Sequence, residues 1–127
     1  MKMRFLWVAA ALVALAVPAF AHHSFAMFDY NKEITVTGSV KELQWTNPHI
    51  HLFVNAPDPK GAMAVFDIEG GTPNNLRRQG WARDVVKPGD KISVVIRPLK
   101  NGDNGGQLIS AKKGDGTAIG GQGGGGE

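Results

Sequence analysis

The strongest structural signal in the chain is the stretch EITVTGSVKEL, residues 33–43. It is rich in β-branched residues, and its apolar side chains alternate, with Ile34, Val36 and Val40 on one face. This two-residue period predicts a strand, because successive side chains of a strand point to opposite faces. Gly38 lies inside the run and predicts a bend or a bulge.

The same pattern predicts four further strands, each bounded by turn residues. They are expected over residues 49–55, 62–69, 91–99 and 107–113. Pro48 separates the first two strands, because proline cannot donate to a strand ladder. The polar, glycine-rich residues 101–106 predict a hairpin loop between the last two strands.

One short helix is predicted after the third of these strands. Thr72 is a suitable N-cap, and Pro73 would occupy the first helical position, where its missing N–H costs nothing. Leu76 would be the apolar contact of the helix, and Gly80 would end it after about two turns. Trp81 is expected to plug one end of the core.

The order of three strands, one helix and two strands predicts a mainly β fold. It fits a small five-stranded OB-like Greek-key barrel, with one short helix between strands 3 and 4. Closing the sheet would also remove exposed strand edges. A small open sandwich is the alternative.

Residues 1–21 are expected to be a signal peptide that is cleaved on export. Lys2 and Arg4 accompany an unbroken apolar run over residues 5–17, and Ala19-Phe20-Ala21 is a small-x-small cleavage sequence. The apolar run is shorter than the roughly 20 residues that span a bilayer as a helix. No stable membrane span is therefore expected after cleavage, and an uncleaved anchor is the alternative.

A single β-barrel domain is expected over residues 22–113, followed by a disordered tail. Residues 114–127 are mostly glycine, which has no side chain to bury and loses the most backbone entropy on ordering. A G-x-G-x-x-G pattern at the end of this segment has neither the preceding strand nor the following helix that a dinucleotide site requires. The tail is therefore not expected to bind a nucleotide.

Composition excludes several classes of function. The chain has no cysteine, so disulfides, thiolate nucleophiles and Fe–S clusters are absent. Its formal net charge of +3 falls to +1 once Lys2 and Arg4 leave with the signal peptide. A nearly neutral exported chain without a basic run is not expected to bind nucleic acid.

Four motifs occur in a fixed order: His22-His23-Ser24-Phe25, Trp45-Thr46-Asn47-Pro48-His49, Gly80-Trp81-Ala82-Arg83-Asp84 and Lys87-Pro88-Gly89-Asp90. Together with the N-terminal signal, they resemble the DUF6152 family of small exported bacterial proteins, which has no established activity. The resemblance covers nearly all of residues 21–113. It implies an exported β-rich domain, and it supplies no catalytic residues. The signal peptide makes the expected location periplasmic or secreted.

All four histidines follow the expected cleavage site, and they form two pairs. His49 and His51 are two residues apart in an expected strand, so both rings should lie on one outward face, with Phe53 next along it. Two imidazoles in this arrangement can share a metal ion. The alternative is that both face solvent without a ligand.

Cleavage after Ala21 would give His22 a free α-amino group beside its own imidazole. These two nitrogens form a bidentate chelate that suits Cu(II) best, with Ni(II) and Zn(II) behind it. A third nitrogen from His49 or His51 would complete a site similar to the histidine brace of copper enzymes. His23 is a further candidate ligand, and a frayed terminus without a ligand is the alternative.

The expected function is that of an exported, non-enzymatic binding protein. Its candidate metal ligands are His22, His49, His51 and His23, with Cu(II) or another divalent metal as the ligand. No carboxylate pair, triad or G-x-S-x-G motif indicates an enzyme. The alternative is a metal-free OB-like module that binds a ligand or an unidentified periplasmic protein. Its contact surface would be Thr35, Thr37, Ser39 and Lys41, or the region of Arg77, Arg78 and Trp81.

Overall fold

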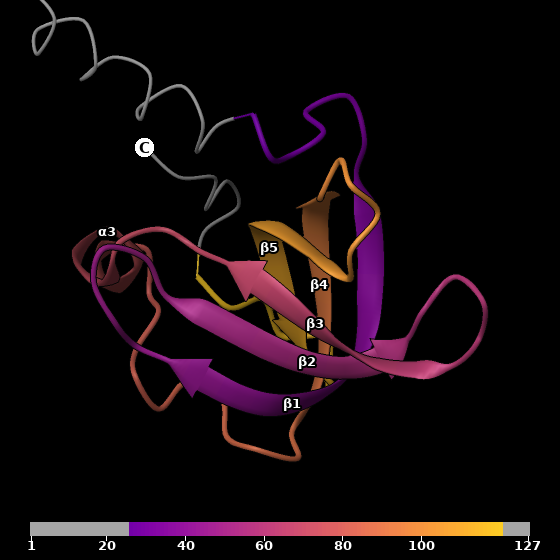
Figure 1. Ribbon diagram of the computed structural model, residues 1–127. Coiled ribbons are helices and arrows are strands. Elements are labelled where there is room, and N and C mark those ends of the chain that lie inside the picture. The colour runs from indigo at the N-terminus through magenta and orange to yellow at the C-terminus, as the bar shows by residue number, and fades with distance from the viewer. Residues whose placement is uncertain (1–25, 121–127) are drawn as a thin grey trace, which may run out of the picture.

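The computed structural model describes residues 26–120 as a closed five-stranded barrel with one short helix (Figure 1). Its elements are β1 (Ile34–Gln44), β2 (His51–Pro57), β3 (Met63–Glu69), α3 (Pro73–Arg78), β4 (Lys91–Pro98) and β5 (Gly105–Lys113). The strands close in the order β1-β2-β3-β5-β4. This confirms the OB-like barrel and excludes the open sandwich, because β1 pairs with both β2 and β4.

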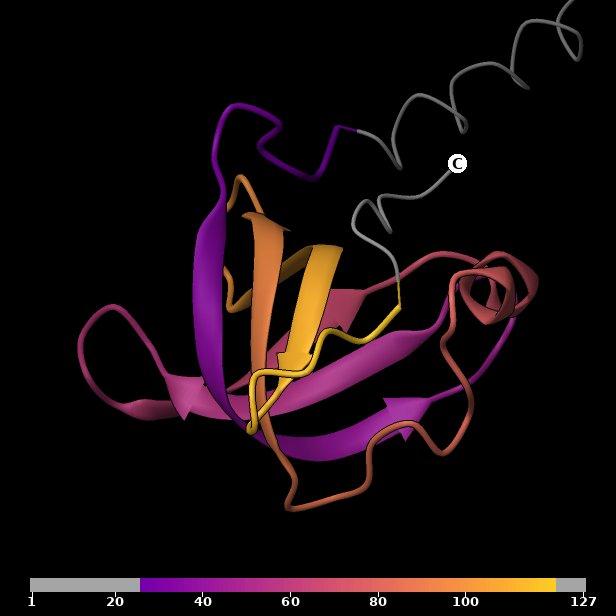
Figure 2. The same cartoon turned by 180° about the vertical axis from the view of Figure 1, so that it is seen from behind.

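Neighbouring strands are antiparallel at every position of the barrel except one. β3 and β5 run parallel, and their ladder is short, joining Asp67 to Gly105 and Glu69 to Gln107. Figure 2 shows β4 between β1 and β5, on the side that faces away from the viewer in Figure 1. The short parallel ladder is the seam that closes the barrel.

β1 passes from one neighbouring strand to the other close to Gly38. The first half of the strand pairs with β4 as far as Ser39, and Ser39 also begins the pairing with β2. A Cβ atom at Gly38 would collide with the backbone carbonyl of Asn55 on β2. A β-bulge between Val40 and Glu42 then shifts the register, which the sequence does not reveal.

The barrel interior is filled by apolar side chains that alternate along the strands. Among the most deeply buried are Leu52, Val54, Ile68, Ile92, Val94, Ile96 and Leu108. Trp81 belongs to the same cluster and is only 3% exposed. Its predicted burial is thus confirmed.

The helix α3 forms where the sequence predicts it. The Thr72 hydroxyl accepts a hydrogen bond from the backbone N–H of Asn75 at 3.2 Å, which caps the first turn. Leu76 is buried in the core, and Gly80 follows with a φ of 98°, a left-handed conformation that glycine adopts without strain.

The folded unit extends beyond Lys113, so the expected start of a disordered tail at residue 114 is wrong. Residues 114–117 turn the chain back, and Ala118 forms a β-bridge with Lys112. Ile119 is 4% exposed and packs in the core cluster. The sequence signal failed here because glycines that permit a tight turn have the same composition as a disordered linker.

The barrel also includes residues before β1. Phe28 is buried and forms a β-bridge with Leu99. Among residues 26–120, no helix has the length and apolar character needed to cross a membrane. The expected signal peptide, its cleavage site and the last residues of the expected tail lie outside the described residues.

Candidate functional site

The histidine pair of the sequence analysis lies at the start of β2, on the outer surface of the barrel. β2 begins at His51, two residues later than predicted, but the strand-like hydrogen bonding starts earlier. Ile50 donates to the carbonyl of Gly71 and accepts from the N–H of Gly70. Ile50 is fully buried, so the half-buried His49 and His51 on either side of it emerge outward.

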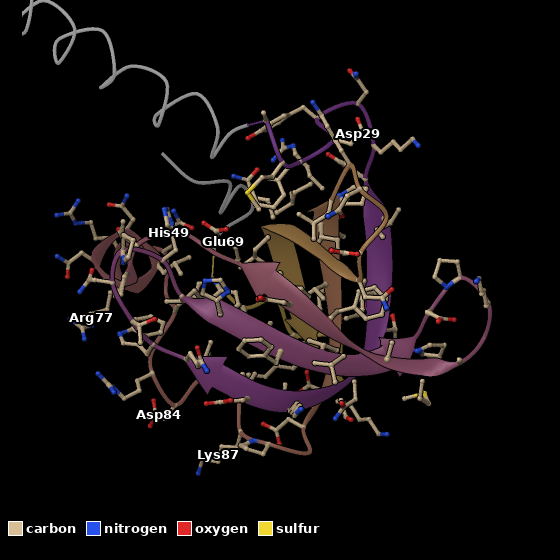
Figure 3. All side chains as sticks on the ribbon, viewed as in Figure 1. Asp29, His49, Glu69, Arg77, Asp84 and Lys87 are labelled. Carbon is tan, nitrogen blue, oxygen red and sulfur yellow. The ribbon has the colours of Figure 1, made fainter. Side chains whose placement is uncertain are left out.

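Two carboxylates of β3 contact these histidines. Glu69 lies opposite His51 in the β2–β3 ladder, and Asp67 lies two residues earlier on the same outer face. His51 Nδ1 is 2.7 Å from Asp67 Oδ1, and His49 Nε2 is 3.7 Å from Glu69 Oε1. Figure 3 shows His49 and Glu69 beside each other near the end of β3.

Hydrogen-bond partners determine which ring nitrogen of each histidine carries hydrogen. His49 Nδ1 is 3.0 Å from the carbonyl oxygen of Gly70, which can only accept, so Nδ1 donates. His51 Nδ1 likewise donates to the Asp67 carboxylate. In the neutral form of each ring, the lone pair is therefore on Nε2.

This arrangement matches the one that protein metal ligands require. A ligating histidine almost always donates its second ring N–H to a carboxylate or a backbone carbonyl, which fixes the ring orientation. His49 and His51 have one partner of each kind. Both side chains are also partly exposed, at 41% and 33%, so a metal can reach them from solvent.

The structure brings two of the four predicted metal ligands to one surface. His49 and His51 lie there, whereas His22 and His23 lie outside the described residues. Within residues 26–120, no group of three or more histidine, cysteine, aspartate or glutamate side chains is placed to hold a metal ion. The described surface therefore offers donors in pairs.

Sequence reasoning missed the two carboxylates on β3. Asp67 and Glu69 alternate in the sequence with the apolar Phe66 and Ile68, which are buried. This alternation indicates that the two acids face outward. Antiparallel pairing of two consecutive strands places outward residues of one strand beside outward residues of the next. Applied to the predicted strands over 49–55 and 62–69, this rule would have paired the histidines with acids.

His51 takes part in one aromatic contact, and Arg77 takes part in another. The rings of His51 and Phe53 are stacked, with centroids 6.1 Å apart and planes inclined by 20°. The Arg77 guanidinium lies 6.0 Å from the centroid of Trp45. Arg77 and Arg78 are exposed, but Trp81 is buried, so the expected contact surface of these three residues loses its aromatic member.

A separate hollow of about 510 Å³ lies between the first half of β1, the β2–β3 turn and the β4–β5 loop. Phe66, Pro57 and Leu99 are among its apolar lining residues, and Asp58 is a lining carboxylate. The Asp58 carboxylate already accepts hydrogen bonds from the backbone N–H groups of Lys60 and Ala62. The carboxylate therefore stabilises the turn to which it belongs.

Comparisons with known proteins give one match. The model of a family described as a family of unknown function, DUF6152, matches residues 10–109. No curated protein matches the chain. No solved structure matches it either.

Proposed function

The chain belongs to the DUF6152 family, whose function is unknown, and we propose that it is an exported, non-enzymatic protein that binds a divalent metal. Cu(II) is the first candidate, and the site of action is the periplasm or the exterior of the cell. His49 and His51 supply imidazole nitrogens from the outer face of the barrel. After cleavage behind Ala21, His22 supplies its amine and its ring, and His23 is the alternative ring donor.

The observation that carries the proposal is the shared orientation of His49 and His51. Each ring donates its Nδ1 hydrogen to an oxygen, which leaves the Nε2 lone pair available for a metal. A histidine that merely faces solvent needs no such partner. Nitrogen donors favour Cu(II) over the other common divalent metals.

The terminal amine supports the proposal for a second reason. An α-amino group has a reference pKa near 8 and a histidine near 6.5, so both nitrogens lose protons to a metal close to neutral pH. A His22 terminus thus adds two donor nitrogens from a single residue. They would complete a site that begins with a pair of donors on the described surface.

The test is a Cu(II) titration monitored by EPR, on exported protein whose N-terminus is verified as His22 by intact mass. We expect one tight equivalent of copper with nitrogen hyperfine structure. A protein with one extra residue before His22 should bind markedly more weakly, because its amine no longer belongs to a histidine. Copper that remains in its aquo form would refute the proposal, and equal binding by the extended protein would refute the role of the amine.

Substitution of the strand histidines provides the matched comparison. His49→Ala with His51→Ala should abolish tight binding, and His23→Ala measures whether this alternative ring donor contributes. If the double variant binds copper as the unmodified protein does, the strand histidines are not ligands. A protein that binds no metal at all would leave the metal-free module. Its contact surface would be that of Thr35, Thr37, Ser39 and Lys41, or the region of Arg77 and Arg78.

A further inference from the structure

The relationship between His49 and Glu69 differs from an ordinary hydrogen bond. Nε2 and Oε1 are 3.7 Å apart, which is longer than the roughly 3.2 Å limit of a good N–H···O bond. Both side chains are partly exposed, at 41% and 30%. The two groups therefore face each other across a gap that solvent can enter.

The electronic character of the two atoms makes this gap suitable for a cation. Because His49 Nδ1 carries the hydrogen, Nε2 of the neutral ring presents a lone pair, and the Glu69 carboxylate also presents lone pairs. Two facing acceptors are stabilised only by a positive species between them, either a proton or a metal ion.

The spacing is close to that of two ligands on one metal. With metal–nitrogen and metal–oxygen distances of about 2.1 Å, two ligand atoms at a tetrahedral angle lie about 3.4 Å apart. The observed 3.7 Å differs from this by a few tenths of an ångström. A glutamate side chain can close that difference by small rotations without moving the strand.

The neighbouring acid plays a different part. Asp67 contacts His51 at Nδ1, the nitrogen that points away from a metal bound at Nε2, so it orients the ring. Glu69 is instead on the Nε2 side of His49. The two carboxylates are two residues apart on one strand face, yet they approach different ring nitrogens. Asp67 is at Nδ1 of His51, whereas Glu69 is at Nε2 of His49.

We infer that Glu69 is itself a metal ligand, which joins His49 Nε2 in a mixed nitrogen and oxygen site. The inference rests on the proposed function and adds to it a residue that the histidine pattern did not supply. An imidazole with a carboxylate suits divalent ions such as Zn(II) and Cu(II), whereas Cu(I) prefers sulfur ligands. The site should therefore discriminate by oxidation state in favour of Cu(II).

The experiment compares Glu69→Gln with Glu42→Gln by competition titration of Cu(II) and Zn(II) against a chromophoric chelator. Glu42 lies on the adjacent strand β1, opposite the outward Phe53, so its substitution removes the same charge from the same outer face. We expect Glu69→Gln to weaken binding of both metals by at least about tenfold. This is a lower bound, because even the loss of an outer-shell partner weakens metal binding by about 10- to 100-fold. Glu42→Gln should change it by less than about threefold.

The outcomes separate the two proposals. If the unmodified protein binds neither metal, the proposed function fails. If it binds tightly and Glu69→Gln binds equally well, or if the two variants lose affinity equally, only the role of Glu69 fails.

A second variant excludes a purely structural explanation. Glu69→Asp keeps the charge but withdraws the oxygen by one methylene, so it should also weaken binding and alter the Cu(II) EPR signal. Thermal melting of the metal-free variants provides the folding control. Normal affinity and an unchanged EPR signal in a folded Glu69→Asp protein would contradict direct ligation.

Discussion

The guanidinium of Arg77 lies over the ring of Trp45, 6.0 Å from the ring centroid. Arg77 belongs to the last turn of α3, and Trp45 begins the loop that leads to β2 and its histidines. Trp45 is 7% exposed, so its ring is fixed in the core while one face receives the cation. The contact thus joins α3 to the loop that leads to the candidate metal ligands His49 and His51.

Arg77→Ala is expected to destabilise the protein by about 0.5–1 kcal/mol, the usual value of an exposed cation–π contact. Arg78→Ala removes the same charge from the same turn of α3 and should cost less. Urea unfolding of the two variants measures the difference. Equal midpoints would mean that the contact contributes nothing to stability.

Gly38→Ala is expected to destabilise the barrel by about 1–3 kcal/mol. The added methyl would collide with the Asn55 carbonyl on β2, and backbone cannot move aside cheaply. Gly71→Ala is the control, because its methyl would meet only Leu76 Cγ at an ordinary 3.8 Å. Urea unfolding should show this control to be neutral or slightly stabilised, by up to about 1 kcal/mol.

Ile119→Ala is expected to cost about 2–5 kcal/mol, because it empties part of the core. Ile34→Ala makes the same chemical change at a residue that is 41% exposed, and should cost at most about 1 kcal/mol. Thermal or urea unfolding measures both. Similar losses in the two variants would contradict the packing of Ile119 against the barrel.

Asp67→Ala is expected to weaken Cu(II) binding roughly 10- to 100-fold if His51 ligates the metal, because its ring loses the partner that orients it. Glu33→Ala removes a carboxylate from an exposed position before β1 and serves as the charge control. The measurement is the same chelator competition. Unchanged affinity in Asp67→Ala would show that the orientation of the His51 ring is irrelevant to binding.

Local sequence signals were sufficient to predict the barrel. Alternation in residues 33–43 predicted β1, and the Thr72-Pro73 pair with Gly80 predicted both ends of α3, because caps depend on residues close in sequence. The strand and helix order then favoured a closed barrel over an open sandwich, and the observed pairing decided between them. Strand bounds were displaced by up to two residues, as at β2, where the chain pairs before a regular strand begins.

Features that depend on distant contacts were not predictable. The bulge after Val40 is set by how β1 passes from one neighbour to the other, which no local pattern encodes. The burial of Ile119 depends on a return of the chain onto β5. A single isoleucine among glycines carries no periodicity from which that return could be inferred.

The same division between local signals and distant contacts explains why only part of the candidate site was predicted. The outward placement of His49 and His51 follows from alternation, and the structure agrees with it. Their acid partners come from another strand, so Glu69 became visible only once the β2–β3 register was known. The ring nitrogens that carry hydrogen likewise follow from partners on β3 and at Gly70.

Among the described residues, β5 is the last strand to be synthesised, yet it forms the ladders with both β3 and β4. A growing chain that ends before Gly105 lacks both ladders, and it also lacks Leu108, Ala111 and Ile119 from the core. The barrel therefore cannot close until the chain as far as Ile119 has left the ribosome. Until then the earlier strands remain available to any cellular machinery that has to engage this protein before it folds.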